Sequence, residues 1–269
     1  MLTLLSLLNR LPGFRRLWLK FPLGSIDTRI EFSIWDRPHY AFGVYRAADL
    51  AHRLKLPAIS VIEFGVAGGE GLLELEHLAQ LIGPHFGVTV SVVGFDTGAG
   101  LPKALDYRDL PYYWRSGFYK MDIEKLKSKL TRASLMLGDA AETIPQLLAQ
   151  QIDPIGFVAF DLDYYSSTKK ALRIFSGPQE TRLPRVFCYF DDIMSDLGCF
   201  NDYTGELCAI REHNLEECNS KLCPLHGLEW MYRYPAGWQS KFYVLHDFKH
   251  PLYCTYITGE DERDKLALR

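Results

Sequence analysis

Acidic residues stand at the ends of several short apolar runs that have the composition of β-strands. They are Glu63, Asp96, Asp139, Asp161 and the pair Asp191 and Asp192. In open α/β sheets, ligands bind at the carboxyl ends of the strands. One carboxylate at such a place is ordinary, because a strand has to end in something polar. A row of them predicts a ligand rich in hydroxyl and amino groups, or a metal ion.

A glycine-rich segment, EFGVAGGEG, follows the first of these runs and opens a helical pattern at residues 63–71. Gly65, Gly68 and Gly69 permit a tight turn and a close approach of the backbone to a bound molecule. The spacing does not give the G-x-G-x-x-G fingerprint of dinucleotide binding, and there is no Walker A lysine. The segment therefore predicts a cofactor loop that does not hold a pyrophosphate. The alternative is a tight turn without a ligand.

Apolar runs alternate with helical patterns, and these predict the elements that position the polar residues. Strands are expected at residues 58–64, 89–96, 134–139, 155–161 and 185–192. Helices are expected at 38–54, 70–82, 122–130, 140–151 and 166–175, and Gly83 and Pro84 are expected to close the second of them. Right-handed crossovers between such strands give a doubly wound, mostly parallel sheet. The predicted fold class is therefore α/β and Rossmann-like.

The two ends of the chain add to this core. Residues 1–57 predict an N-terminal helical cover, and residues 58–269 the α/β domain, with 194–238 as an irregular insertion on the substrate side. The runs 241–248 and 252–257 are expected to pair as a C-terminal antiparallel hairpin, because no helix separates them. The first eight residues are mostly apolar but too few to span a bilayer. They predict either a packing or dimerising helix or a contact with a membrane surface.

Composition limits the size, the compartment and the partners of the protein. A chain of 269 residues that is 48% hydrophobic can bury the core of one α/β domain with additions. The net charge of −3 and the mixed signs favour a small-molecule substrate over nucleic acid, and no integral membrane segment is expected. The six cysteines occupy the last third, which predicts reduced thiols in a cytoplasmic protein. Cysteines and histidines between 208 and 226 match no common zinc pattern.

The glycine-rich segment resembles the E-x-G-x-x-x-G loop of class I S-adenosylmethionine-dependent methyltransferases. The resemblance implies that Glu63, Gly65, Gly68 and Gly69 surround the methionine part of S-adenosylmethionine. Asp96 falls where that family keeps the acid that binds the ribose hydroxyls. The segment Gly138, Asp139 and Ala140 matches the position that contacts adenine.

A narrower resemblance covers roughly residues 59 to 192. Sugar O-methyltransferases of the macrocin O-methyltransferase type carry D-x-D-x-Y-x-S-T after the fourth strand and an Asp-Asp pair after the next. This chain has DLDYYSST from Asp161, and then Asp191 and Asp192, with Leu162 where the family usually has glycine. The resemblance implies that Asp161, Asp191 and Asp192 bind a metal ion. It also implies that Asp161 or Asp163 takes the proton of the acceptor hydroxyl.

Physical chemistry agrees with a metal at this place. Neighbouring parallel strands would bring Asp161 close to Asp191 and Asp192, and three such carboxylates repel one another unless a cation lies among them. Hard oxygen ligands favour Mg²⁺. The alternative is that Asp163 caps the following helix through Ser166 and that the acidic pair is an ordinary part of a loop.

The leading hypothesis is a magnesium-dependent O-methyltransferase that acts on a hydroxyl of a sugar-containing or secondary-metabolite acceptor. The aromatic-rich loop 97–120 either closes over the site or is a plain packed loop. For His39, reaching the site from the N-terminal cover is the less favoured interpretation. A homodimer is compatible with the apolar N-terminus. Three alternatives remain open: a metal-independent small-molecule methyltransferase, a nicotinamide-dependent oxidoreductase and a non-catalytic binding module.

Overall fold

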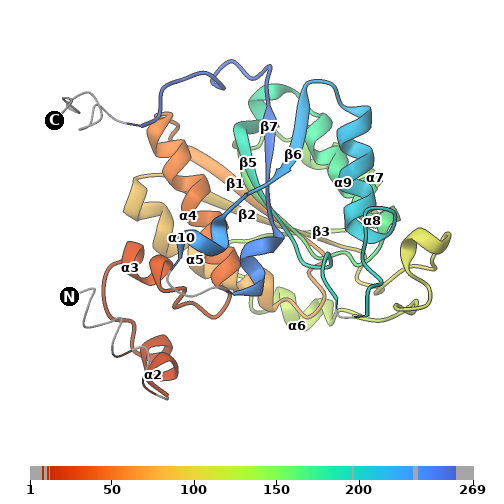
Figure 1. Cartoon of the computed structure of the whole chain (residues 1–269), viewed down its shortest axis with the longest axis horizontal. Coiled ribbons are helices and arrows are strands. Elements are labelled where there is room, and N and C mark those ends of the chain that lie inside the picture. Colours follow the sequence, from red (N-terminus) through yellow and green to blue (C-terminus); the bar gives the residue numbers. More distant parts are fainter. Residues whose placement is uncertain (1–7, 9–10, 12, 196, 233–235, 259–269) are drawn as a thin grey trace.

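The computed structural model describes residues 8, 11, 13–195, 197–232 and 236–258. A seven-stranded sheet forms its centre, with the strand order β3-β2-β1-β4-β5-β7-β6 (Figure 1). The strands are β1 Ala58–Phe64, β2 Thr89–Asp96, β3 Ser134–Leu137, β4 Ile155–Phe160, β5 Arg182–Phe190, β6 Ser220–Pro224 and β7 Phe242–Asp247. The first five are parallel, and β7 runs antiparallel to both β5 and β6. The predicted Rossmann-like α/β fold with a C-terminal antiparallel hairpin is thus confirmed.

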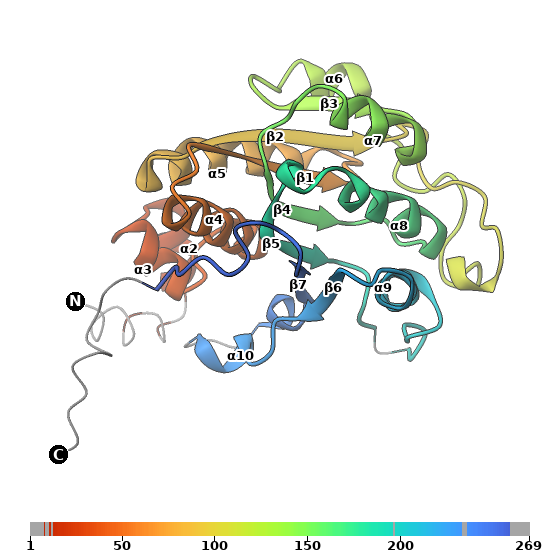
Figure 2. The ribbon, with the colours of Figure 1, turned by 90° about the horizontal axis from the view of Figure 1, so that it is seen from above.

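Helices cover both faces of this sheet (Figure 2). The described helices are α2 Phe14–Lys20, α3 Ile26–Glu31, α4 Pro38–Arg53, α5 Glu70–Phe86, α6 Ile123–Lys127, α7 Ala140–Leu148, α8 Tyr165–Ala171, α9 Gly205–Glu216 and α10 Leu228–Met231. Alternate residues of β4 point to opposite faces, so Phe157 packs in the cluster under α4 and α5, and Phe160 in the cluster under α7, α8 and α9. Strand β4, which is covered on both faces, is therefore apolar and buried along its whole length.

The predicted hairpin has the wrong second strand. Residues 252–257 form turns and coil, and the partner of β7 in the hairpin is β6. Both edges of β7 are occupied, one by β5 and the other by β6, so no backbone groups remain for a further strand. The prediction failed because the segment before β7 was taken to be irregular.

The segment 194–238 is more regular than the sequence indicates. Its described residues contain α9, β6 and α10, and β6 closes one edge of the sheet. Helix α9 was not predicted, because its apolar residues are not spaced so that they lie on one side of a helix. Whether the segment lies on the substrate side stays a prediction.

The helix predicted to end at residue 82 also continues further. It runs through Pro84 to Phe86 and ends at Gly87, whose φ of 68° gives the left-handed C-cap. The helical patterns at 122–130, 140–151 and 166–175 end earlier than predicted, at Lys127, Leu148 and Ala171. Short 3-10 turns follow the last of them over Leu172–Ser176.

The described part of the N-terminal region is helical. Helix α4 packs into the main core, and α2 packs through Trp18 on Phe32 and Ile34. The division of the chain at residue 58 stays a prediction, and most of the apolar first eight residues lie outside the described residues. No helix of the described residues is long and apolar enough to cross a membrane. All six cysteines are free, as expected.

A buried ion pair ties the start of β5 to the end of β7. The Arg182 guanidinium donates from Nε and Nη2 to Asp247 Oδ2 over 3.0 and 2.6 Å, and the two side chains are 8% and 2% exposed. Removing one partner of such a pair leaves an uncompensated buried charge, which costs about 3–5 kcal/mol.

We therefore expect Arg182→Met to lower the free energy of unfolding by about 3–5 kcal/mol in urea denaturation. The double variant Arg182→Met/Asp247→Leu should recover part of this loss, because it leaves no unpaired charge. Arg53→Met is the matched control: its pair with Asp49 is on the surface and should contribute less than about 1 kcal/mol. Equal losses in the two arginine variants would contradict the assignment.

Candidate active site

A cavity opens at the carboxyl ends of β1, β2, β4 and β5. Its volume is about 450 Å³, within the range of about 300–1,000 Å³ that is usual for small-molecule sites. The predicted site residues that line it are Gly65, Asp96, Gly138, Asp139, Ala140, Asp161, Asp163, Asp191 and Asp192. Three others, Glu63, Gly68 and Gly69, do not line it. Most of the predicted residues thus surround one space, and their individual roles stay predictions.

The glycine turn is shaped by the close approach of two strands. A Cβ on Gly65, whose φ is 87°, would lie 1.8 Å from the carbonyl oxygen of Asp161. Gly69 also has a φ of 87° and begins α5. Gly68 faces open space, so no contact requires a glycine there. Ala67 lines the cavity with a φ of 46°, and sequence reasoning did not single it out.

Glu63 is buried beneath this turn. The Tyr40 hydroxyl of α4 donates to Glu63 Oε1 over 2.6 Å, and Oε2 has no hydrogen-bond partner among the described residues. Burial raises the pKa of Glu63 to about 8, although the bond from Tyr40 opposes this. A Cβ on Gly71 would lie 1.8 Å from Glu63 Oε1, so this glycine makes room for the carboxyl group. The glycine turn therefore lies above the carboxyl group of Glu63, which can carry a proton at neutral pH.

Asp96 and Asp139 mark two further sides of the cavity. Asp96 accepts from the amides of Ala67 over 2.9 Å and Gly98 over 2.6 Å, which fixes its carboxylate at the end of β2. Asp139 caps α7 by accepting from the Ala141 amide, and it pairs with Lys170 over 2.6 Å. The Lys170 ammonium holds the pKa of Asp139 below its usual range. Asp139 therefore remains charged at neutral pH.

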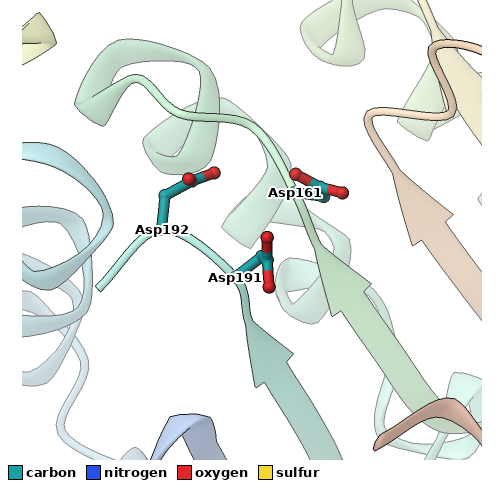
Figure 3. A group of neighbouring side chains, drawn as sticks. All are labelled: Asp161, Asp191 and Asp192. Carbon is teal, nitrogen blue, oxygen red and sulfur yellow. The ribbon is translucent and has the colours of Figure 1, made fainter. Parts of the chain in front are cut away.

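The sheet register brings the acids of β4 and β5 together. Phe160 pairs with Phe190, so Asp161 and Asp191 leave neighbouring strands at the same level. One carboxylate oxygen each of Asp161, Asp191 and Asp192 lies within 4.8 Å of the other two (Figure 3). No other group of three or more metal-ligating side chains was found in the described part of the chain, so zinc at Cys208–His226 has no support.

Burial and mutual repulsion disfavour the charged forms of Asp161 and of the nearby Asp163. Burial and the charges of Asp192 and Asp191 raise the pKa of Asp161 to about 8. Burial and the charge of Asp161 also raise the pKa of Asp163 to about 7. Asp163 has a φ of 61°, and its amide donates to Asp192 Oδ2 over 3.2 Å. Because Asp163 takes the left-handed conformation itself, the turn does not need a glycine at Leu162.

Asp191 differs from its neighbours because cationic and hydroxyl groups stabilise its charge. Although burial opposes it, the Tyr189 hydroxyl and the Lys241 ammonium lower its pKa; their distances to Oδ1 are 2.7 and 3.1 Å. His39 stacks on the Tyr189 ring at 4.4 Å and stays neutral, since burial lowers its pKa to about 3. His39 thus supports Tyr189 behind the cavity and does not line it.

Glu206 joins the two acidic loops. This fully buried residue of α9 accepts from the Asp192 amide through Oε2 over 3.0 Å and from the Leu162 amide through Oε1 over 3.4 Å. Glu206 and Lys241 were both missed by sequence reasoning. Each lies in a segment whose place beside the site depends on the β6–β7 hairpin, so no local motif could have revealed them.

Hydrogen bonds attach the aromatic-rich loop 97–120 to the first turn of α8. Asp109 is fully buried and accepts from the Ser166 amide and hydroxyl over 2.8 and 2.9 Å, and from the Leu105 amide. Asp163 therefore does not cap this helix, as the alternative interpretation required. Trp114 and Tyr119 of the same loop line the cavity. The loop forms a wall of the site.

The fold is shared with solved methyltransferase structures. CalS11, described as a calicheamicin methyltransferase, superposes with a TM-score of 0.53 at 23% sequence identity, and the match covers 91% of this chain and 90% of that one. The O-methyltransferase NovP gives a TM-score of 0.52 at 14% identity over 78% of this chain and 79% of its own. No protein-family model matches the chain, and no curated protein matches its sequence. At these identities the likeness establishes the fold, and the chemistry has to be argued from the site.

The raised pKa values predict how metal-free protein responds to pH. An acid whose pKa is higher in the folded state stabilises the fold below its unfolded pKa, and this contribution is lost as the pH rises through the folded pKa. With chelator present, we expect the free energy of unfolding to fall by at least about 1 kcal/mol between pH 6.5 and 8.5, as Asp163 and Asp161 ionise.

Urea denaturation of Asp163→Asn tests this expectation, because asparagine also accepts a left-handed backbone and carries no charge. Its stability should depend less on pH across the same window. Asp202→Asn, on an exposed loop, is the matched control and should keep the dependence of the parent protein. Identical slopes in all three proteins would show that the buried cluster does not titrate there.

Proposed function

We propose that the chain is an S-adenosylmethionine-dependent O-methyltransferase that uses Mg²⁺ and methylates a hydroxyl of a sugar-containing or secondary-metabolite acceptor. The observation that carries the proposal is that one cavity is lined by the glycine turn with Asp96 and, next to it, by the acidic cluster of Asp161, Asp191 and Asp192. A methyl donor and a hydroxyl acceptor would therefore meet in one space.

The cofactor has a place on the β1–β2 side of the cavity. Asp96 presents a carboxyl group whose orientation the Ala67 and Gly98 amides fix, which suits two ribose hydroxyls. Gly65 and Ala67 line the cavity as backbone and small side chains, so a ligand can approach them closely. Gly138 and Ala140 offer a similar small-residue surface for adenine. The unpartnered Oε2 of Glu63 lies buried beneath the turn and supports this end of the site.

The acidic cluster fits a divalent ion by its donor chemistry. Three carboxylate oxygens that lie this close repel one another, and hard oxygen ligands of this kind suit Mg²⁺. Bound there, the ion supplies a Lewis acid that lowers the pKa of an acceptor hydroxyl. Asp161, Asp191 and Asp192 would hold it, with Asp191 fixed by Tyr189 and Lys241 and Asp192 fixed by Glu206.

The remaining chemistry is positioning and proton transfer. In methyl transfer the carbon–sulfur bond breaks as an oxygen–carbon bond forms, and the hydroxyl loses its proton. Asp161 or Asp163 would accept this proton, since both carboxylates line the cavity. Trp114 and Tyr119 shield the space from water and offer ring faces on which a sugar can pack.

The alternatives differ in what each requires of the cavity. A nicotinamide-dependent oxidoreductase needs a pyrophosphate loop, which the spacing of Gly65, Gly68 and Gly69 does not provide. A metal-independent methyltransferase would use Asp161 only to orient the acceptor. A non-catalytic module would have no need for several buried carboxylates at one edge, since such burial is costly.

Calorimetric titration with S-adenosylmethionine tests the proposal through two variants that separate the roles. Asp96→Ala should weaken cofactor binding about 10- to 100-fold, because it removes charge-assisted hydrogen bonds. Asp191→Asn should leave cofactor affinity within about threefold and abolish the heat of Mg²⁺ binding, since it keeps the shape and removes the charge. Asp202→Asn is the control for the loss of an acid elsewhere.

Titration of the parent protein with NAD and with chelator decides among the alternatives. Heat from NAD and none from S-adenosylmethionine would overturn the proposed cofactor. Cofactor binding without any heat from Mg²⁺ would favour the metal-independent enzyme. Equal loss of cofactor binding in Asp96→Ala and Asp191→Asn would contradict the division of the cavity into two parts.

A further inference from the structure

The N-terminal helix α2 has two apolar faces, and only one of them is used in packing. Trp18 is buried against Phe32, and its indole nitrogen donates to the Leu23 carbonyl over 2.8 Å. Arg15 donates to the carbonyl oxygens of Phe32 and Ser33. These contacts fix the inner face of the helix and therefore determine which residues point outward.

The outer face carries large apolar residues that pack on nothing in the described structure. Leu17 and Phe21 are one helical turn apart and are 55% and 57% exposed, and Leu11 and Leu23 on either side are 56% and 53% exposed. Figure 1 shows α2 at the periphery, beyond α3. Together with Arg16 and Lys20, we call these four residues the N-terminal surface. Four exposed large apolar residues within thirteen positions of the chain are typical of an interaction site.

The charged residues of this first segment of the chain, up to residue 26, have one sign. Arg16 and Lys20 are exposed and also one turn apart, beside Leu17 and Phe21. The sequence has no acidic residue before Asp27, whereas Arg10, Arg15, Arg16 and Lys20 precede it and the chain as a whole is negative. No ion pair of Arg16 or Lys20 is formed within the part of the chain that the structure describes. The surface therefore combines apolar residues with unneutralised positive charge.

We propose that the N-terminal surface docks on an anionic membrane. An interfacial helix buries its apolar face at the boundary of headgroups and acyl chains while its cations meet the anionic headgroups. A symmetric dimer is a poorer match, because a two-fold contact through this surface would bring Arg16 and Lys20 of both copies together. The proposal does not depend on the proposed function, since none of these residues lines the cavity.

Two pairs of substitutions separate the apolar and electrostatic parts. Leu17→Ser/Phe21→Ser leaves Trp18 and Arg15 in place, so the helix stays docked on its inner face. It should lower membrane affinity more than about 100-fold, because two large side chains no longer enter the bilayer. Arg16→Gln/Lys20→Gln should lower it about 25-fold, at about fivefold per cation.

The experiment is co-sedimentation of the full chain with vesicles of phosphatidylcholine alone and of phosphatidylcholine with 30% phosphatidylserine, at about 0.1 M and then higher salt. Binding to the anionic vesicles only, weakened by salt and by both pairs of substitutions, is the expected result. Leu215→Ser/Phe248→Ser is the control for exposed apolar residues elsewhere. Lys125→Gln/Lys129→Gln is the control for exposed cations, one on α6 and one in the turn that follows it. Both controls should bind like the parent.

Three results would overturn the proposal. One is the absence of binding to anionic vesicles, and another is binding that the N-terminal pairs and the control pairs reduce equally. The third is self-association, seen by analytical ultracentrifugation without vesicles, that Leu17→Ser/Phe21→Ser abolishes while vesicle binding is absent. Calorimetric titration with S-adenosylmethionine on the same variants should be unchanged, so a failure here is distinguishable from a failure of the proposed function.

Discussion

The register of β4 between β1 and β5 is the constraint on which the site depends. Phe64 pairs with Phe160, and Phe160 pairs with Phe190, so the three strands end at one level. This alignment places Gly65 against the Asp161 backbone and Asp161 beside Asp191. A slip of one residue would turn the phenylalanines out of their core and separate the glycine turn from the acidic cluster. Packing in the core thus fixes the geometry of the polar edge.

The acidic cluster of Asp161, Asp191 and Asp192 also explains why residues from distant segments of the chain contact this edge of the sheet. Buried carboxylates are costly unless hydrogen bonds or cations offset their repulsion. Lys241 from the start of β7 stabilises the charge of Asp191, and Glu206 from α9 accepts the amides that leave the ends of β4 and β5. The hairpin of β6 and β7 therefore does more than extend the sheet. Lys241, which directly precedes β7, adds a cation to the site, and α9, which precedes β6, adds the acceptor Glu206.

The sequence predicted the local parts of this arrangement better than the distant ones. The bounds of β1 and β2 matched because each is a mostly apolar run next to a clear boundary, the glycine turn after β1 and Asp96 at the end of β2. The acids Asp161, Asp191 and Asp192 were expected together because parallel strands share an edge. The partner of β7 was predicted wrongly. Two segments could have paired with its free edge, and the local sequence pattern does not show which of them does. Glu206 and Lys241 were missed for the same reason. The roles of Asp96 and Asp139 as backbone caps also required coordinates.

The aromatic-rich loop 97–120, which forms one wall of the cavity, is fixed in place by hydrogen bonds. Asp109 fixes the loop to the first turn of α8, and backbone bonds between Leu101 and both Gly117 and Phe118 close its base. Opening it as a lid would break the two hydrogen bonds from Ser166 and expose Asp109, which is fully buried. A wall fixed in this way presents Trp114 and Tyr119 in one arrangement. A ligand of the cavity would therefore meet a preformed shape, in which these two rings form part of the wall.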